Sequence, residues 1–167
     1  MSQDTVKYRN WIRESFGGFF SPIIYNLGKA LIQELGEEKG TALIVKQVEK
    51  FGRSGGEATR KAFESQGKEN SLDNYFSEMN NGTSIYNFAW EGGVKKLDNG
   101  DWVEEWNYCP VAEGFKNLGE EGVKIGELFC NYIDNAVIRE YNPDYEYVRE
   151  RSLNRDGLCR LHAHFTL

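Results

Sequence analysis

Residues 94–110, VKKLDNGDWVEEWNYCP, decide the fold of this 167-residue chain. The Asp98-Asn99-Gly100 segment is a tight-turn signal between two runs with strand character, so it predicts a β-hairpin. On the second run Trp102 and Trp106 share one face, because side chains alternate along a strand. Cys109 ends that strand, and the proline that follows it suits the first turn of a helix.

The chain before this hairpin is predicted to be helical over residues 4–78. Leucines recur every four residues from 27 to 35, which is the spacing of one helix face. Glycines mark the expected breaks. Gly36 and Gly40 bracket a turn, and the Arg-Ser-Gly-Gly segment at 53–56 interrupts or kinks the second long helix. This half is therefore expected to form helical hairpins.

The period of the pattern changes near Thr83, where β structure is expected to begin. Tyr86, Phe88 and Trp90 alternate with other residues there, as side chains on one face of a strand do. The strands of the hairpin follow.

A second helix and a second hairpin complete the chain. The helix is predicted over residues 111–141, split near Gly119 and stopped by Asn142-Pro143. Residues 145–165 are predicted to form two strands around a turn at 154–157. The whole chain, residues 1–167, is thus expected to be a single α+β domain. N-terminal helical hairpins pack on a small antiparallel β-sheet, and a further helix lies between two β-hairpins.

Composition excludes several classes of function. The chain has a net charge of −6 and a pI near 5.1, which argues against binding to nucleic acid or to an anionic membrane. The first 13 residues lack the apolar core of a secretory signal, and the most apolar window, residues 16–32, is interrupted by polar side chains. We therefore expect a cytoplasmic protein that neither spans nor binds a membrane.

All three cysteines lie in the last third of the chain, at Cys109, Cys130 and Cys159. Their spacing matches no zinc-binding motif, so they act together only if the fold gathers them. Asp134 follows Cys130 by four residues, which places both on one face of a helix. Cys159 alternates with Leu161 and is expected to face the core. An odd number of thiols in a reducing compartment also argues against a disulfide framework.

Four ordered motifs carry a resemblance to a known family. The first is Cys-Pro-x-x-Glu, at Cys109, Pro110 and Glu113, and the second is a helical Cys followed four residues on by Asp, at Cys130 and Asp134. The third is Asn-Pro, at Asn142 and Pro143, and the fourth is Asp-x-x-Cys-x-hydrophobic, at Asp156, Cys159 and Leu161. From about Tyr108 to its end the chain resembles the L-2-amino-thiazoline-4-carboxylic acid hydrolase family. Gly157-Leu158 and Arg160 depart from the family pattern, which often has acidic or aromatic residues there.

The resemblance implies hydrolytic opening of a small cyclic amidine or a related carbon–nitrogen bond, with a small molecule as substrate and no cofactor required. The same outline also looks like the vinyl-reductase-type ligand-binding domains, some of which are small-molecule sensors. The alternative reading is therefore a non-catalytic module that binds a small molecule or a metal. The chain shows no fused output domain, which favours the enzyme.

Opening such a ring requires a nucleophile and a group that moves protons. Cys130 or Cys109 is the candidate nucleophile, and Asp134 or Glu113 is the candidate proton carrier. Cys109 lies where a helix begins, and the amino end of a helix lowers a thiol pKa. We also predict that Cys159 completes or walls the site, and that Arg53, beside two glycines, binds a substrate carboxylate through a bidentate contact.

Several patterns have a second interpretation. The three thiols and one carboxylate would suit a zinc or iron ion, although the spacing does not support this. The pair His162 and His164 lies on the strand face opposite Cys159, and a solvated strand face is the favoured interpretation. The tryptophans are expected to be sheet core rather than pocket wall. The acidic runs are expected to be solvated; they are Glu37-Glu38, Glu104-Glu105 and Glu120-Glu121.

Overall fold

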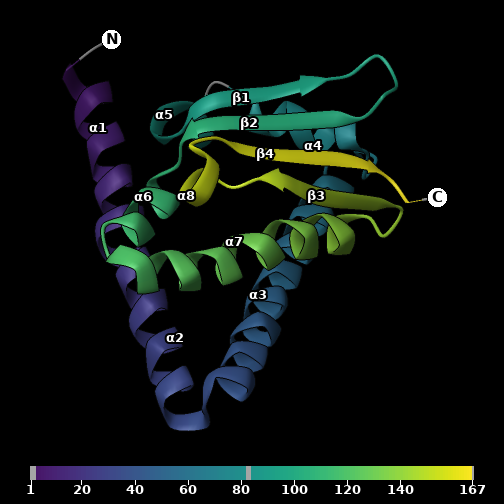
Figure 1. Ribbon diagram of the computed structural model, residues 1–167. Helices are drawn as coiled ribbons and strands as arrows, with labels where there is room; N and C mark the ends of the chain where they lie inside the picture. The colour runs from purple at the N-terminus through teal and green to yellow at the C-terminus, as the bar shows by residue number, and fades with distance from the viewer. Residues whose placement is uncertain (1–2, 82–83, 167) are drawn as a thin grey trace.

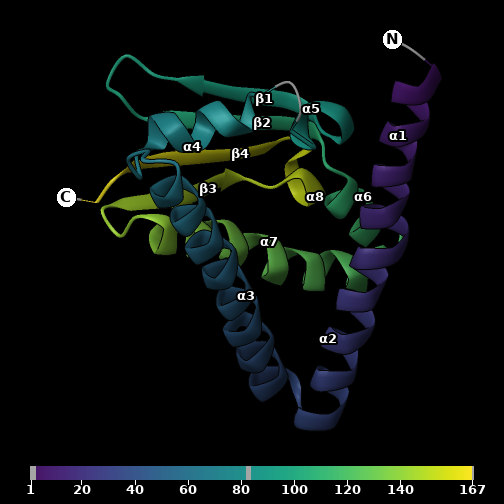
Figure 2. The same ribbon diagram turned by 180° about the vertical axis from the view of Figure 1, so that it is seen from behind.

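The computed structural model describes residues 3–81 and 84–166, and it shows an α+β fold (Figures 1 and 2). A long N-terminal arm consists of α1 (Gln3–Arg13), the π-helix η1 (Glu14–Phe20) and α2 (Ser21–Leu35). Gly36 reverses the chain with a φ of 81°, and α3 (Glu37–Ser65) returns beside the arm. The arm and α3 form the V that opens upward in Figure 1.

The remaining elements build the sheet and the helices that flank it. In chain order they are α4 (Leu72–Met79), α5 (Tyr86–Ala89), β1 (Glu91–Lys96), β2 (Trp102–Tyr108), α6 (Pro110–Lys116), α7 (Gly119–Tyr141), β3 (Tyr145–Arg151), α8 (Leu153–Asp156) and β4 (Cys159–Phe165). The strands pair antiparallel in the order β1-β2-β4-β3. The expected pair of hairpins with a helix between them is confirmed.

One face of the sheet is buried. Figures 1 and 2 place α7 along the sheet and α4 behind it as seen in Figure 1. The tryptophans of β2 and Tyr147 of β3 lie in this core, where Trp102 stacks on Phe76 of α4 with 4.9 Å between ring centroids. Arg160 and His162 lie on the other face, in ion pairs with carboxylates. The period of two along each strand produces this division.

Helix α3 runs without interruption through the segment expected to break it. Gly52 and Gly56 face α7, and a Cβ at Gly52 would lie 2.7 Å from the carbonyl oxygen of Ile133. A Cβ at Gly56 would overlap the carbonyl oxygen of Val137. The prediction of a kink at 53–56 was therefore wrong. Here glycine allows two helices to approach closely, and that packing outweighs its low helix propensity.

Three further expectations need correction. Gly40 lies inside α3, so only Gly36 separates the helices. Residues 86–89 form the short helix α5 instead of a strand, and Thr83, where β structure was expected to begin, lies outside the described residues. The turn expected at 154–157 is the short helix α8, ended by Gly157 with a φ of 68°.

Within residues 3–81 and 84–166, no helix combines the length and the apolar character needed to cross a membrane.

We expect Gly56→Ala to lower the free energy of unfolding by about 1–3 kcal/mol, because the added methyl group would overpack the contact between α3 and α7. Urea denaturation measures the change. Gly55→Ala is the matched control, since a Cβ there meets only a methyl group of Val137 at 3.8 Å. It should be neutral or stabilise the helix by up to about 1 kcal/mol. Equal effects of the two substitutions would contradict the role assigned to Gly56.

Candidate active site

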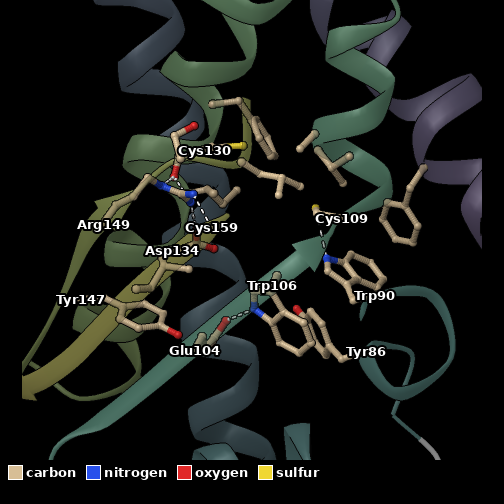
Figure 3. A pocket seen from close by; sticks show the side chains of 18 of the residues that line it. Tyr86, Trp90, Glu104, Trp106, Cys109, Cys130, Asp134, Tyr147, Arg149 and Cys159 are labelled. Atoms are coloured by element: carbon tan, nitrogen blue, oxygen red, sulfur yellow. Dashed lines mark hydrogen bonds and ion pairs between the residues drawn. The ribbon is translucent and has the colours of Figure 1, made fainter. Parts of the chain in front are cut away.

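A pocket of about 260 Å³ lies between the buried face of the sheet and helices η1, α3 and α7 (Figure 3). Its walls are mainly aromatic and aliphatic, and include Phe16, Phe20, Tyr75, Tyr86, Trp90, Trp106, Phe129 and Ile133. Its polar lining comprises Glu104, Asp134, Tyr147, Arg149, Ser152, Asn154 and the three cysteines. An apolar cavity with a few converging polar groups is the usual form of a small-molecule site.

The fold brings the three thiols to this one pocket. Cys109 precedes α6, Cys130 lies in the middle of α7, and Cys159 begins β4. They are free thiols. Figure 3 shows Cys130 and Cys159 near Arg149, and Cys109 beside Trp90. Side chains widely separated in sequence therefore meet at one cavity.

Arg149 organises the polar end of the pocket. Its Nη2 donates to Oδ2 of Asp134 at 2.6 Å, and Nη1 donates to the Sγ of Cys159 at 2.8 Å. Nε and Nη2 also donate to the carbonyl oxygen of Cys130, at 3.2 and 2.7 Å. Only 11% of the Arg149 side chain is exposed. Burial lowers its pKa, but the facing Asp134 and thiols raise it by more, so Arg149 remains a cation.

Asp134 borders the pocket while being paired with Arg149. Protein surrounds it, yet 38% of its side chain is accessible, because that part lines the cavity. Burial raises the pKa of its carboxyl group above the usual value, and Arg149 opposes this shift. Asp134 thus faces the cavity as one partner of an ion pair.

Glu104 is the second acid of the pocket, and sequence analysis missed it. Its side chain was expected in solvent, but only 6% of the residue is exposed. The Nε1 of Trp106 donates to its Oε2 at 2.7 Å, and the Tyr147 hydroxyl lies close by (Figure 3). Burial raises the pKa of Glu104 to about 7. Its position between Trp102 and Trp106 on β2 was the available signal, because alternation places it on their face.

Cys109 has the best environment for a thiolate. Its Sγ accepts a hydrogen bond from Nε1 of Trp90 at 3.1 Å, and the backbone amides of Val111 and Ala112 also donate to it. Burial nevertheless raises the pKa of the thiol, so the lowered pKa expected at this helix start was wrong.

The other two thiols are held more firmly in the neutral form. Burial raises the pKa of Cys159 to about 12, even though Arg149 opposes the shift. Burial also raises the pKa of Cys130 well above its usual range. No described N–H group donates to the sulfur of Cys130. Burial thus favours the neutral form of all three thiols.

Two predicted site residues lie elsewhere. Glu113 forms an ion pair with Lys116 at 2.8 Å on α6 and does not line the pocket. Arg53 lies on α3, with a 3.7 Å ion pair to Glu49, and borders a different pocket. The structure does not bring either to the thiols.

No group of three or more His, Cys, Asp or Glu side chains is placed to hold a metal ion within the described residues. His162 bonds to Asp101 with 2.9 Å between Nε2 and Oδ2, on the sheet face away from the pocket. The arrangement therefore does not support the thiolate–metal interpretation.

The raised pKa of Glu104 has a consequence for stability. Between about pH 5 and 7 the folded chain retains a proton that the unfolded chain has lost, so the free energy of unfolding should fall as pH rises through this window. Glu104→Gln should reduce this slope by up to about 1 kcal/mol per pH unit. Asp134, whose pKa is also raised, contributes in the same direction and leaves a residual slope.

Urea denaturation at pH 5, 6, 7 and 8 measures the slope. Glu105→Gln is the matched control, because Glu105 is the next residue along β2 and pairs with Arg160 on the opposite face of the sheet. Glu105→Gln should keep the part of the pH slope that Glu104 contributes. A wild-type slope in Glu104→Gln would mean that Glu104 does not titrate near neutral pH.

Comparison with known proteins supports the same assignment of family. The model of the L-2-amino-thiazoline-4-carboxylic acid hydrolase family matches residues 17–162, which is most of the chain. No curated protein and no solved structure matches the chain. The match extends upstream of the cysteine motifs into the N-terminal arm, so it includes elements from every wall of the pocket. This chain belongs to the L-2-amino-thiazoline-4-carboxylic acid hydrolase family.

Proposed function

We propose that this protein hydrolyses a small cyclic amidine in the pocket and opens the ring at a carbon–nitrogen bond. One observation carries the proposal: Glu104, a buried carboxyl group whose pKa burial raises to about 7, lines the same pocket as three thiols and the Arg149–Asp134 pair. A group with such a pKa serves as both general base and general acid at neutral pH. The family match supports the reaction class.

Cys109 is the proposed nucleophile, because three N–H groups point at its sulfur. Its thiol proton passes to the ring nitrogen as the sulfur bonds to the amidine carbon, and the carbon–nitrogen bond then breaks. Next, Glu104 takes a proton from a water that attacks the same carbon. The sulfur leaves and recovers a proton, so the net change is the addition of one water.

Asp134 also positions the ring. Asp134 presents its accessible surface to the cavity and accepts hydrogen bonds from the N–H groups of the amidine. Arg149 fixes the direction of that carboxylate through the 2.6 Å bond. The aromatic walls lower the polarity around the ring, which strengthens these interactions.

A second candidate function is binding without catalysis. The observation that favours it is the raised pKa of all three thiols, since a protonated thiol is a weak nucleophile. A ligand-binding module would need only the enclosed aromatic cavity and its polar groups.

We expect the purified protein to convert at least one of a small panel of cyclic amidines to its ring-opened product, detected by liquid chromatography and mass spectrometry. The panel is 2-aminothiazoline-4-carboxylate, 2-aminothiazoline and 2-iminoimidazolidine. Glu104→Gln should reduce kcat by about 100-fold or more, the usual contribution of a general acid–base group. Glu105→Gln, on the opposite sheet face, should retain wild-type turnover. Binding with no turnover of any panel member would favour the binding module.

The choice of nucleophile is tested separately. Cys109→Ser should abolish turnover, and Cys130→Ser should retain a larger fraction of it, because no described N–H group stabilises a thiolate at Cys130. Circular dichroism and the midpoint of thermal unfolding check that each variant is folded. A folded Cys109→Ser variant with full activity would remove that thiol from the reaction, and loss confined to Cys130→Ser would move the role to Cys130.

A further inference from the structure

The charge of the pocket limits what it can bind. Three charged side chains line it among the described residues: Glu104, Asp134 and Arg149. No lysine or histidine belongs to its lining. The pocket thus contains two acids and one base, and its net charge is negative whenever Glu104 is ionised.

Arg149, the cation of the pocket lining, is already bonded to protein groups. Its Nε and both terminal nitrogens donate to protein acceptors, and the ion pair with Asp134 is 2.6 Å long. A ligand carboxylate could bind Arg149 only by displacing Asp134, which would leave a buried acid without its counter-charge. Arg149 therefore acts within the wall of the pocket and is not a receptor for an anion.

Two other arginines are also unavailable to a ligand in this pocket. Arg13 of α1 donates to the carbonyl oxygen of Ala89 at 3.0 Å and to Glu91 at 2.8 Å, and its guanidinium covers the ring of Tyr108. Arg53, predicted to bind a substrate carboxylate, lies outside this pocket.

The aromatic walls favour positive charge. Tyr86 lies between two indoles, with ring centroids 4.9 Å from Trp90 and 6.0 Å from Trp106. The faces of such rings carry negative charge and attract cations, most strongly where water is excluded. Figure 3 shows these rings across the cavity from the Arg149–Asp134 end. A ligand between them meets the aromatic rings and Glu104 on one side and the Arg149–Asp134 pair on the other.

We infer that the pocket selects amidine rings that carry no carboxylate and that bind in the neutral or cationic form. This inference rests on the proposed function for the choice of an amidine, and it adds that the carboxylate in the family's named substrate is unfavourable in this chain. The grounds are the paired Arg149, the two acids and the aromatic walls.

Isothermal titration calorimetry at pH 7.5 with 2-aminothiazoline and with 2-aminothiazoline-4-carboxylate tests the inference. We expect the ring without the carboxylate to bind at least tenfold more tightly. Equal affinity, or tighter binding of the carboxylate, would overturn the inference. If neither ring binds, the inference fails, and the proposed function then depends on turnover of 2-iminoimidazolidine alone. If the preference is present but no compound of the panel is opened, the proposed function fails and the inference stands.

Asp134→Asn provides a reversal test. This substitution keeps the size of the side chain but releases Arg149 from its counter-charge. The variant should gain affinity for the carboxylate relative to the ring without the carboxylate, by tenfold or more compared with wild type. Glu105→Gln, which alters the charge of the opposite sheet face, should leave the preference unchanged. An unchanged preference in a folded Asp134→Asn variant would show that Arg149 does not set it.

Glu104→Gln provides a second test in case Asp134→Asn does not fold. It removes one negative charge and leaves the Arg149–Asp134 pair in place. The variant should lose affinity for 2-aminothiazoline and show a smaller preference than wild type. A preference as large as that of wild type would contradict the electrostatic basis of the inference.

Discussion

The guanidinium of Arg149 ties together three elements that are distant in the sequence. It extends from β3, binds Asp134 and the Cys130 carbonyl of α7, and contacts the sulfur of Cys159 at the start of β4. A buried cation must be paired, so these acceptors hold α7 against the sheet in one register. The position of two of the three thiols follows from this single set of bonds.

The same arrangement separates the properties of the two acids. Asp134 has a full cation as its partner, whereas Glu104 has neutral donors, the indole of Trp106 and the nearby Tyr147 hydroxyl. Glu104 is buried and Asp134 is partly exposed; desolvation raises both pKa values, but Arg149 is the direct ion-pair partner of Asp134 alone. Two carboxyl groups whose environments differ in this way suit different roles: one orients a ligand, and the other transfers protons.

Sequence patterns predicted the elements more completely than the site. The spacing of Cys130 and Asp134 correctly placed both on one helix face, and the alternation at Cys159 correctly placed that side chain toward the core. Arg149 and Glu104 were missed, although alternation along their strands was available. A charged residue in a strand usually faces water, and only its tertiary partners show otherwise. The helix break predicted near Gly56 failed for the same reason: the packing partner of that glycine lies on α7, about eighty residues away.

The cysteine motifs lie in the last third of the chain, but the pocket also depends on the N-terminal arm. Ser21 donates to the carbonyl oxygen of Val111 at 2.9 Å, and a Cβ at Gly114 would lie 2.5 Å from the carbonyl oxygen of Gly17. These close contacts fix the start of α6, whose amides point at Cys109. Phe16 and Phe20 of η1 supply part of the aromatic wall. The environment of Cys109 is thus set by residues roughly ninety positions earlier, so a fragment limited to the motifs would keep the thiols and lose the cavity that surrounds them.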